Sequence, residues 1–177
     1  MLKYVTSLIL FFFLTGCFAG IYKQGSVVGY HNHTVQTRGG AFKIGPLPSY
    51  WRNKKIKYRA VFFVNARDHS SITIDSWCQG ACDDASLSVL TDQLTRGIAD
   101  YKITQRTVSQ LAGRDVLQTE ALGTVDGRRV FLSFYVLKMN HCVFDFVYVS
   151  EPGRLEYYGE FKHMVQGFKF VKGPDVL

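Results

Sequence analysis

The sequence predicts an α+β fold: a three-layer α/β/α sandwich in which an antiparallel sheet is covered by a helix on each face. Two near-continuous apolar runs, at 129–137 and 142–149, are separated by only four residues, so we expect two antiparallel strands. Continuous apolar runs are typical of strands that are covered on both faces. Two stretches with helical periodicity, about 84–96 and 154–167, are the expected cover.

The first half of the domain is expected to form a hairpin followed by a helix. Stretches 58–64 and 72–77 are rich in β-branched and aromatic residues and flank the turn residues 68–71. The helix over 84–96 has N-cap candidates at 83–86 and an apolar stripe, and Gly97 is placed to end it. The stripe consists of Leu87, Leu90 and Leu94.

The second half is expected to be a meander of strands closed by a helix. Asp126-Gly127 is a favoured hairpin dipeptide, because a type I′ turn requires positive φ at both central residues. The helix over 154–167 presents one apolar stripe, made by Leu155, Tyr158, Phe161, Val165 and Phe168. The expected strands are 103–111, 115–125, 129–137 and 142–149.

Residues 1–16 have the features of a signal peptide. Lys3 precedes an apolar run of ten residues, Val5 to Leu14, which is too short to span a bilayer as a helix. The run ends in Leu14-Thr15-Gly16-Cys17, which resembles the lipobox of bacterial lipoproteins. The resemblance implies cleavage before Cys17 and acylation of that residue with fatty acids such as palmitate. The alternative is an ordinary secretory signal in which the cysteine occurs by chance.

The lipobox resemblance also implies a location in the cell envelope. Phe18, rather than Asp, follows the cysteine, and by the sorting rule of enteric bacteria this implies the outer membrane, facing the periplasm. The chain carries a formal charge of +7, and removal of residues 1–16, with one lysine and no acid, leaves 20 − 14 = +6. A basic excess is consistent with residence near anionic lipid.

The stretch 17–40 is expected to be a lipidated cysteine followed by a flexible tether, and 41–172 the folded domain. The tether is rich in glycine and has no sustained period. His31 and His33 lie within it. They can chelate a metal, but no Cys or acid is close by in sequence, so we predict no metal site.

Three cysteines remain after Cys17, and an oxidising periplasm favours a disulfide. We predict a local Cys78–Cys82 bond, since a spacing of four can bring the two Cα atoms into range. Cys142 is then expected to be a buried thiol. Two other interpretations of Cys78 and Cys82 are less favoured. A zinc site lacks a fourth ligand. A redox motif would have two residues between its cysteines rather than three.

Several further segments resemble the PsbP-like superfamily. They are Gly-Arg at 113–114, the turn at 123–127, the two long apolar strands, and the ending from Glu160-Phe161 to Gly167-Phe168. The resemblance covers roughly residues 42–170. It implies the sandwich fold and a role as an accessory or assembly subunit of a larger complex, with no catalytic residues to carry over.

Asp145 lies inside an apolar strand, where an unpaired carboxylate is costly. By strand alternation it shares a face with Val143, Val147 and Val149. One interpretation is a carboxyl group with a raised pKa that acts as an acid or base. The favoured interpretation is an ion pair with one of the arginines Arg59, Arg114, Arg128 and Arg129.

A cluster of basic and aromatic residues precedes the first expected strand. It is a candidate surface for anionic head groups or a protein partner; export argues against nucleic acid. The alternative is a solvated strand in which Trp51 belongs to the core. The cluster consists of Tyr50, Trp51, Arg52, Lys54, Lys55, Lys57 and Arg59.

No nucleophile, metal or nucleotide motif occurs in the chain, and His69, His141 and His163 are dispersed. The sequence therefore predicts a membrane-anchored, non-enzymatic accessory or assembly subunit of an envelope complex, such as lipid transport machinery, with no cofactor. Two alternatives are a carrier for a lipid or other small apolar ligand, and an enzyme that uses Asp145.

Overall fold

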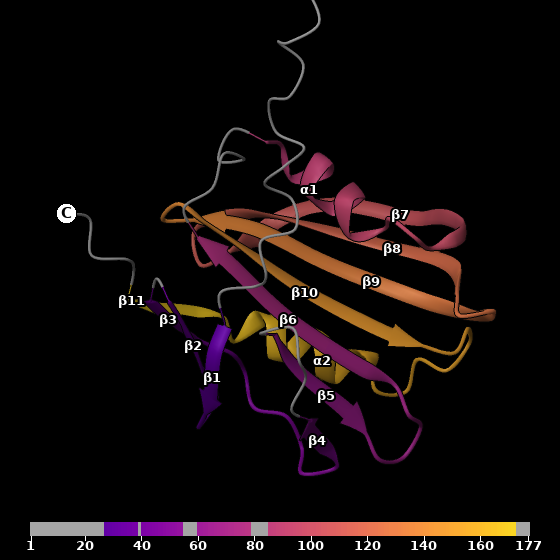
Figure 1. Ribbon diagram of the computed structural model, residues 1–177, viewed down its shortest axis with the longest axis horizontal. Coiled ribbons are helices and arrows are strands. Elements are labelled where there is room, and N and C mark those ends of the chain that lie inside the picture. Colours follow the sequence, from indigo (N-terminus) through magenta and orange to yellow (C-terminus); the bar gives the residue numbers. More distant parts are fainter. Residues whose placement is uncertain (1–26, 39, 55–59, 79–84, 173–177) are drawn as a thin grey trace, which may run out of the picture.

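The computed structural model describes residues 27–38, 40–54, 60–78 and 85–172. These residues form two antiparallel sheets and two short helices (Figure 1). The larger sheet has seven strands in the order β4-β5-β6-β10-β9-β8-β7. Its strands are β4 (Trp51–Lys54), β5 (Val61–Asn65), β6 (Ser71–Cys78), β7 (Ala99–Leu111), β8 (Arg114–Val125), β9 (Arg128–Met139) and β10 (Cys142–Ser150).

The smaller sheet has four strands in the order β1-β2-β3-β11. They are β1 (Val27–His31), β2 (Thr34–Thr37), β3 (Gly40–Lys43) and β11 (Lys169–Lys172). The prediction of a tether over 17–40 is therefore wrong from residue 27 onward, and His31 and His33 lie at the β1–β2 turn. Val35 in β2 is fully buried, so this sheet is part of the core.

The predicted three-layer sandwich with a helix covering each face is wrong, because the fold is mostly antiparallel sheet. The helices are only α1 (Leu87–Leu94) and α2 (Tyr158–Gln166), shorter than the predicted stretches 84–96 and 154–167. Ser86 caps α1 by accepting a hydrogen bond from the Val89 amide, so the helix starts after it. α1 contacts β8 and β9, while α2 contacts β10 and shares the opposite side with the small sheet.

The four strands predicted in the second half are confirmed as β7 to β10, with ends shifted by a few residues. At the β8–β9 hairpin, Asp126 and Gly127 both have positive φ, 48° and 76°, as the turn dipeptide predicts. Consecutive residues of β9 from Phe131 to Leu137 are all buried, which confirms the interpretation that both faces of this strand are covered.

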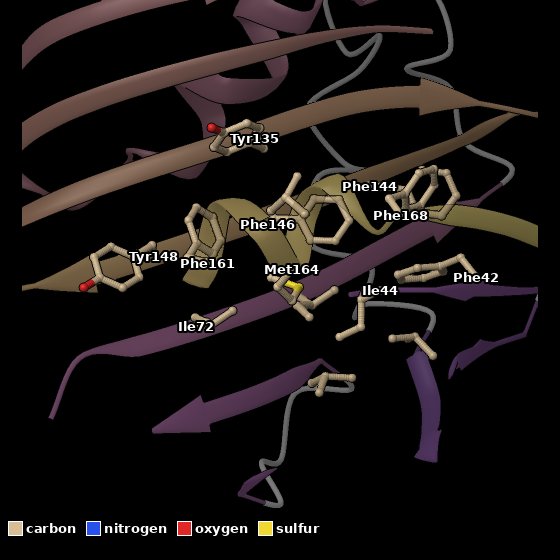
Figure 2. Close-up of a cluster of buried hydrophobic side chains, with 14 of the residues drawn as sticks. Phe42, Ile44, Ile72, Tyr135, Phe144, Phe146, Tyr148, Phe161, Met164 and Phe168 are labelled. Atoms are coloured by element: carbon tan, nitrogen blue, oxygen red, sulfur yellow. The ribbon is translucent and has the colours of Figure 1, made fainter. Parts of the chain in front are cut away.

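Aromatic rings fill the space between the large sheet, the small sheet and α2 (Figure 2). Tyr148 of β10 and Phe161 of α2 have ring centroids 5.4 Å apart, and Phe42 of β3 lies 5.0 Å from Phe144 of β10. These residues pack against one another and form the core between the large sheet, the small sheet and α2.

A buried hydroxyl fixes the first turn of α2 on the sheet. The Tyr158 hydroxyl donates to Glu120 Oε1 of β8 at 2.7 Å and lies 2.9 Å from Ser133 Oγ of β9. Burial raises the pKa of Tyr158, so the hydroxyl stays protonated and able to donate. This contact sets the position of the helix that forms one wall of the candidate site.

The disulfide joins Cys78 of β6 to Cys142 of β10, which are paired directly across the two strands. The predicted Cys78–Cys82 bond is therefore wrong, and Cys142 is not a buried thiol. Cys78 and Cys142 are 64 positions apart in the sequence, and the pairing of β6 with β10 brings them together. Cys82 lies outside the described residues.

Candidate functional site

An open apolar groove runs between the turn after β3 and the exposed side of α2. Its volume is about 410 Å³. We call it the α2 groove, and it is lined by Pro46, Leu47, Pro48, Gly159, Glu160 and His163. The two prolines restrict the backbone on either side of Leu47, so the wall of the groove is preformed.

Close approach of two glycine backbones holds this turn against α2. The Gly45 amide donates to the Met164 carbonyl at 2.8 Å. A Cβ atom on Gly167 would lie 2.3 Å from the Gly45 Cα atom, a distance that side chains do not reach. Only glycine leaves room for this contact, and without the contact the groove would lose one of its walls.

We expect Gly167→Ala to lower the free energy of unfolding by about 2–3 kcal/mol, because the added methyl group meets backbone atoms that cannot rotate away. Backbone strain is not the cause, since φ of Gly167 is −76°. Urea denaturation measures the loss.

The matched control for Gly167→Ala is Gly159→Ala, where a Cβ atom would have no neighbour within 4 Å. This second substitution should leave stability unchanged or slightly increase it, because alanine favours helix over glycine. Equal stability of the two variants would contradict the close-packing argument.

Polar bonds connect β4 to the helical wall of the groove. The Trp51 indole nitrogen donates to Glu160 Oε2 at 2.6 Å, and the Tyr50 hydroxyl donates to Glu160 Oε1. The hydrogen bond to Glu160 raises the pKa of Tyr50. Arg67 lies over the Tyr50 ring, with its Cζ atom 4.0 Å from the ring centroid. Glu160 is thus held in place with both oxygens occupied.

The structure divides the predicted basic and aromatic cluster. Trp51 is 5% exposed and belongs to the core, as the alternative interpretation expects, and Tyr50 is half-buried beside it. Arg52 and Lys54 are exposed on the edge strand β4. By strand alternation their side chains point to the face opposite to Trp51, and so away from the α2 groove. Lys55, Lys57 and Arg59 lie outside the described residues.

Asp145 is 5% exposed and faces another acid rather than an arginine. Its register partner on β6 is Asp75, and the indole of Trp77 donates a hydrogen bond to Asp145. Burial, together with repulsion by Asp75, raises the pKa of Asp145 to about 7, and burial raises that of Asp75 to about 6. No histidine acts on the pKa of Asp145 within the described residues.

The predicted ion pair of Asp145 is absent from the described part of the chain. Arg114, Arg128 and Arg129 are exposed at the ends of β8 and β9, and the fourth candidate, Arg59, lies outside the described residues. The strand ends place these side chains away from the middle of β10, where Asp145 lies. The carboxyl pair is therefore a buried feature without a described cationic partner.

The α2 groove was not predicted from the sequence. Glu160 is hydrogen-bonded to Tyr50 and Trp51, which are 110 and 109 positions away in the sequence, and no local pattern reveals such contacts. One local signal was available: Leu47 stands between Pro46 and Pro48, whose fixed φ angles restrict the backbone on both sides of an apolar residue. His163 was expected to be a dispersed surface histidine; it is exposed, and it lines the groove.

The described residues contain neither a cluster of metal ligands nor a helix that could span a membrane. They contain no group of three or more His, Cys, Asp or Glu side chains that could hold a metal ion. Neither α1 nor α2, the helices of this same part, is long and apolar enough to cross a membrane.

No model of a known protein family matches the chain, and no curated protein matches it. Solved structures do show similar folds. LpqN of Mycobacterium tuberculosis, involved in cell envelope biogenesis, is 12% identical with a TM-score of 0.55, covering 76% of this chain and 86% of its own. The cyanobacterial PsbP protein CyanoP of Synechocystis is 13% identical with a TM-score of 0.55, covering 83% and 98%.

The Ran-binding protein Mog1p of Saccharomyces cerevisiae is also similar, at 13% identity and a TM-score of 0.56, covering 81% of this chain and 97% of its own. At such identities the likeness shows the fold alone. The resemblance to PsbP-like proteins is therefore confirmed at the level of the fold.

Proposed function

We propose that this protein is a lipid-anchored bacterial envelope protein, facing the periplasm, that works without catalysis as an accessory or assembly subunit. In this proposal it docks on its complex through the α2 groove. The occupant is an extended protein segment that inserts an apolar side chain into the groove and carries acidic residues beside it.

The observation that carries the docking proposal is the chemistry of the groove and its rim. The walls are apolar and preformed, which suits an inserted aliphatic or aromatic side chain. The exposed cation Arg67, which lies over the Tyr50 ring beside Glu160, favours an acidic flank in the partner, and the chain as a whole carries +7. Glu160 is already bonded through both oxygens, so it adds little repulsion.

The anchoring proposal rests on the sequence Leu14-Thr15-Gly16-Cys17. Two of the proteins with a similar fold support it by analogy, since LpqN is involved in cell envelope biogenesis and CyanoP is a cyanobacterial PsbP. Val27, the first residue of a described strand, is ten positions after Cys17 in the sequence. A chain of that length reaches about 35 Å at most, so an acyl anchor would keep the domain near the membrane.

The docking proposal predicts that Gly159→Leu strongly reduces partner capture while leaving the fold intact. Nothing lies within 4 Å of a Cβ atom at this position, so the leucine side chain fits and occupies the groove. Cells that express the full chain are treated with a crosslinker, and the products are compared for wild type, Gly159→Leu and Gly159→Ala. We expect one protein product to be retained in Gly159→Ala and reduced about tenfold or more in Gly159→Leu.

Two results would contradict docking of a protein at this groove. One is a crosslinked partner that is retained equally in Gly159→Leu. The other is a small apolar molecule that copurifies with wild type, is detected by native mass spectrometry, and is lost in Gly159→Leu. The second result would instead support the carrier alternative.

The anchor is tested separately, so that its failure does not affect the groove. Cells grown with radioactive palmitate should label the wild-type chain and not Cys17→Ala, and the variant should lose its association with membranes. Equal labelling of the two chains would contradict lipidation at Cys17.

A further inference from the structure

The seven-stranded sheet has two end strands, and they differ in how they are protected. Exposed strand edges offer unpaired N–H and C=O groups, and proteins usually block them with charges, bulges or very short strands. β4 has only four residues, of which Arg52 and Lys54 are exposed cations. β7 is thirteen residues long, and the described residues provide no strand that pairs with its outer edge.

The second half of β7 lacks these protective features. The irregularities in its pairing with β8 lie between Ala99 and Gln105, and from there to Leu111 the register is regular. This half contains neither proline nor glycine. Its one charged residue, Arg106, is engaged by Asp92 of α1 at 2.6 Å. All positions from Lys102 to Gln110 are exposed, including Val108 at 60%.

We propose that this edge pairs antiparallel with β7 of a second copy, so that two seven-stranded sheets join into one. The two copies would be related by a two-fold axis perpendicular to the sheet. Residues opposed across the two strands must point to the same face of the sheet, so the axis passes through a residue and not between two residues. With Thr107 opposite itself, Arg106 faces Val108, and Ile103 faces Leu111. No like charges are opposed, and threonine pairs and apolar pairs are both favourable across strands.

A second copy fits this edge better than a charged partner does. The stretch from Thr107 to Leu111 carries no charge, so it has no electrostatic feature that would select an acidic or basic ligand. Its composition, Thr, Val, Ser, Gln and Leu, combines strand-forming residues with side chains that can pair with themselves. The proposal is independent of the α2 groove.

Disulfide trapping of the full chain tests the register. Thr107→Cys would place two thiols on the axis, where opposed Cα atoms are about 4.5–5.5 Å apart, within reach of a disulfide. Gln105→Cys alone would hold its two thiols about 14 Å apart, since its partner is Ser109. We expect covalent dimers for Thr107→Cys, none for Gln105→Cys, and dimers again for the Gln105→Cys, Ser109→Cys double variant.

Sedimentation velocity of the full chain in detergent tests the association itself. Wild type and Val108→Thr should dimerise, whereas Val108→Lys opposes Arg106 of the second copy and should weaken dimerisation about tenfold or more. Val89→Lys adds the same charge on the exposed face of α1 and should leave dimerisation unchanged. A wild type that stays monomeric at all concentrations, or equal dimerisation of Val108→Lys and Val89→Lys, would overturn the proposal.

Discussion

Removing the Cys78–Cys142 disulfide is expected to lower the free energy of unfolding by about 4 kcal/mol, the value that loop entropy gives for a closed loop of this length. The bond connects β6 to β10, so it links the hairpin of the first half to the meander of the second. Urea denaturation of the wild type with and without reductant measures the change. The Cys78→Ala, Cys142→Ala double variant should have the stability of the reduced protein and should not respond to reductant.

Cys82→Ser is the control that separates the two pairings. If Cys78 is bonded to Cys142, this variant keeps its full stability and still loses stability when it is reduced. A bond between Cys78 and Cys82 would close only a short loop and contribute less. A Cys82→Ser variant that is as unstable as the double alanine variant would contradict the observed pairing.

The missed disulfide shows where local patterns stop being informative. Cys78 and Cys82 are neighbours in sequence, and that proximity alone favoured their pairing. The correct partner depends on which strands are adjacent in the sheet. β6 is bonded to β10 across three intervening strands of the chain and α1, and no periodicity within either strand encodes that choice.

The same distinction explains which parts of the fold were predictable. The long strands β9 and β10 were predicted because each buries both faces, which leaves a continuous apolar run in the sequence. The strands β1 and β2 are short and include exposed polar positions, so their sequence resembles a tether. β2 pairs with β3, which in turn pairs with β11 near the other end of the sequence, and β1 contacts β5 and β6 of the large sheet.

The candidate site was predictable only in part. Of the basic and aromatic cluster that was predicted, Tyr50 and Trp51 are bonded to Glu160 in the wall of the α2 groove, whereas Arg52 and Lys54 point to the other face of β4. The sequence could not reveal the groove, because Glu160 and Gly159 approach β4 and the turn after β3 only when α2 packs on the sheet. Close packing of Gly45 on Gly167 is likewise a property of the fold and not of either segment.

The buried carboxyl pair of Asp75 and Asp145 is expected to make the protein less stable as pH rises from about 4 to about 7. Both acids have raised pKa values in the folded protein, so between those limits the folded chain binds more protons than the unfolded chain. Stability therefore falls with increasing pH. For Asp145 alone, the loss between pH 4 and pH 7 is on the order of 4 kcal/mol.

The physical cause is the cross-strand register of the two acids. Residues directly opposed on antiparallel strands have Cβ atoms about 4.5–5.5 Å apart, and like charges at that distance are destabilising. Below pH 6 a proton on Asp145 removes the repulsion, and the protonated carboxyl group can donate to Asp75. Above pH 7 both carboxylates are charged, while Oδ1 of Asp145 has no hydrogen-bond partner among the described residues.

Asp145→Asn should therefore be more stable than wild type at pH 8 and should show a smaller decrease in stability between pH 5 and pH 8. The amide has nearly the same shape, carries no charge, and can donate to Asp75. Asp92→Asn, which removes an exposed carboxylate that pairs with Arg106, is the matched control and should leave the pH dependence unchanged. Urea denaturation at several pH values gives both curves. If Asp145→Asn and Asp92→Asn follow the wild-type curve alike, the two acids do not govern the pH response, because removing a group whose pKa changes on folding must change the slope of the stability curve.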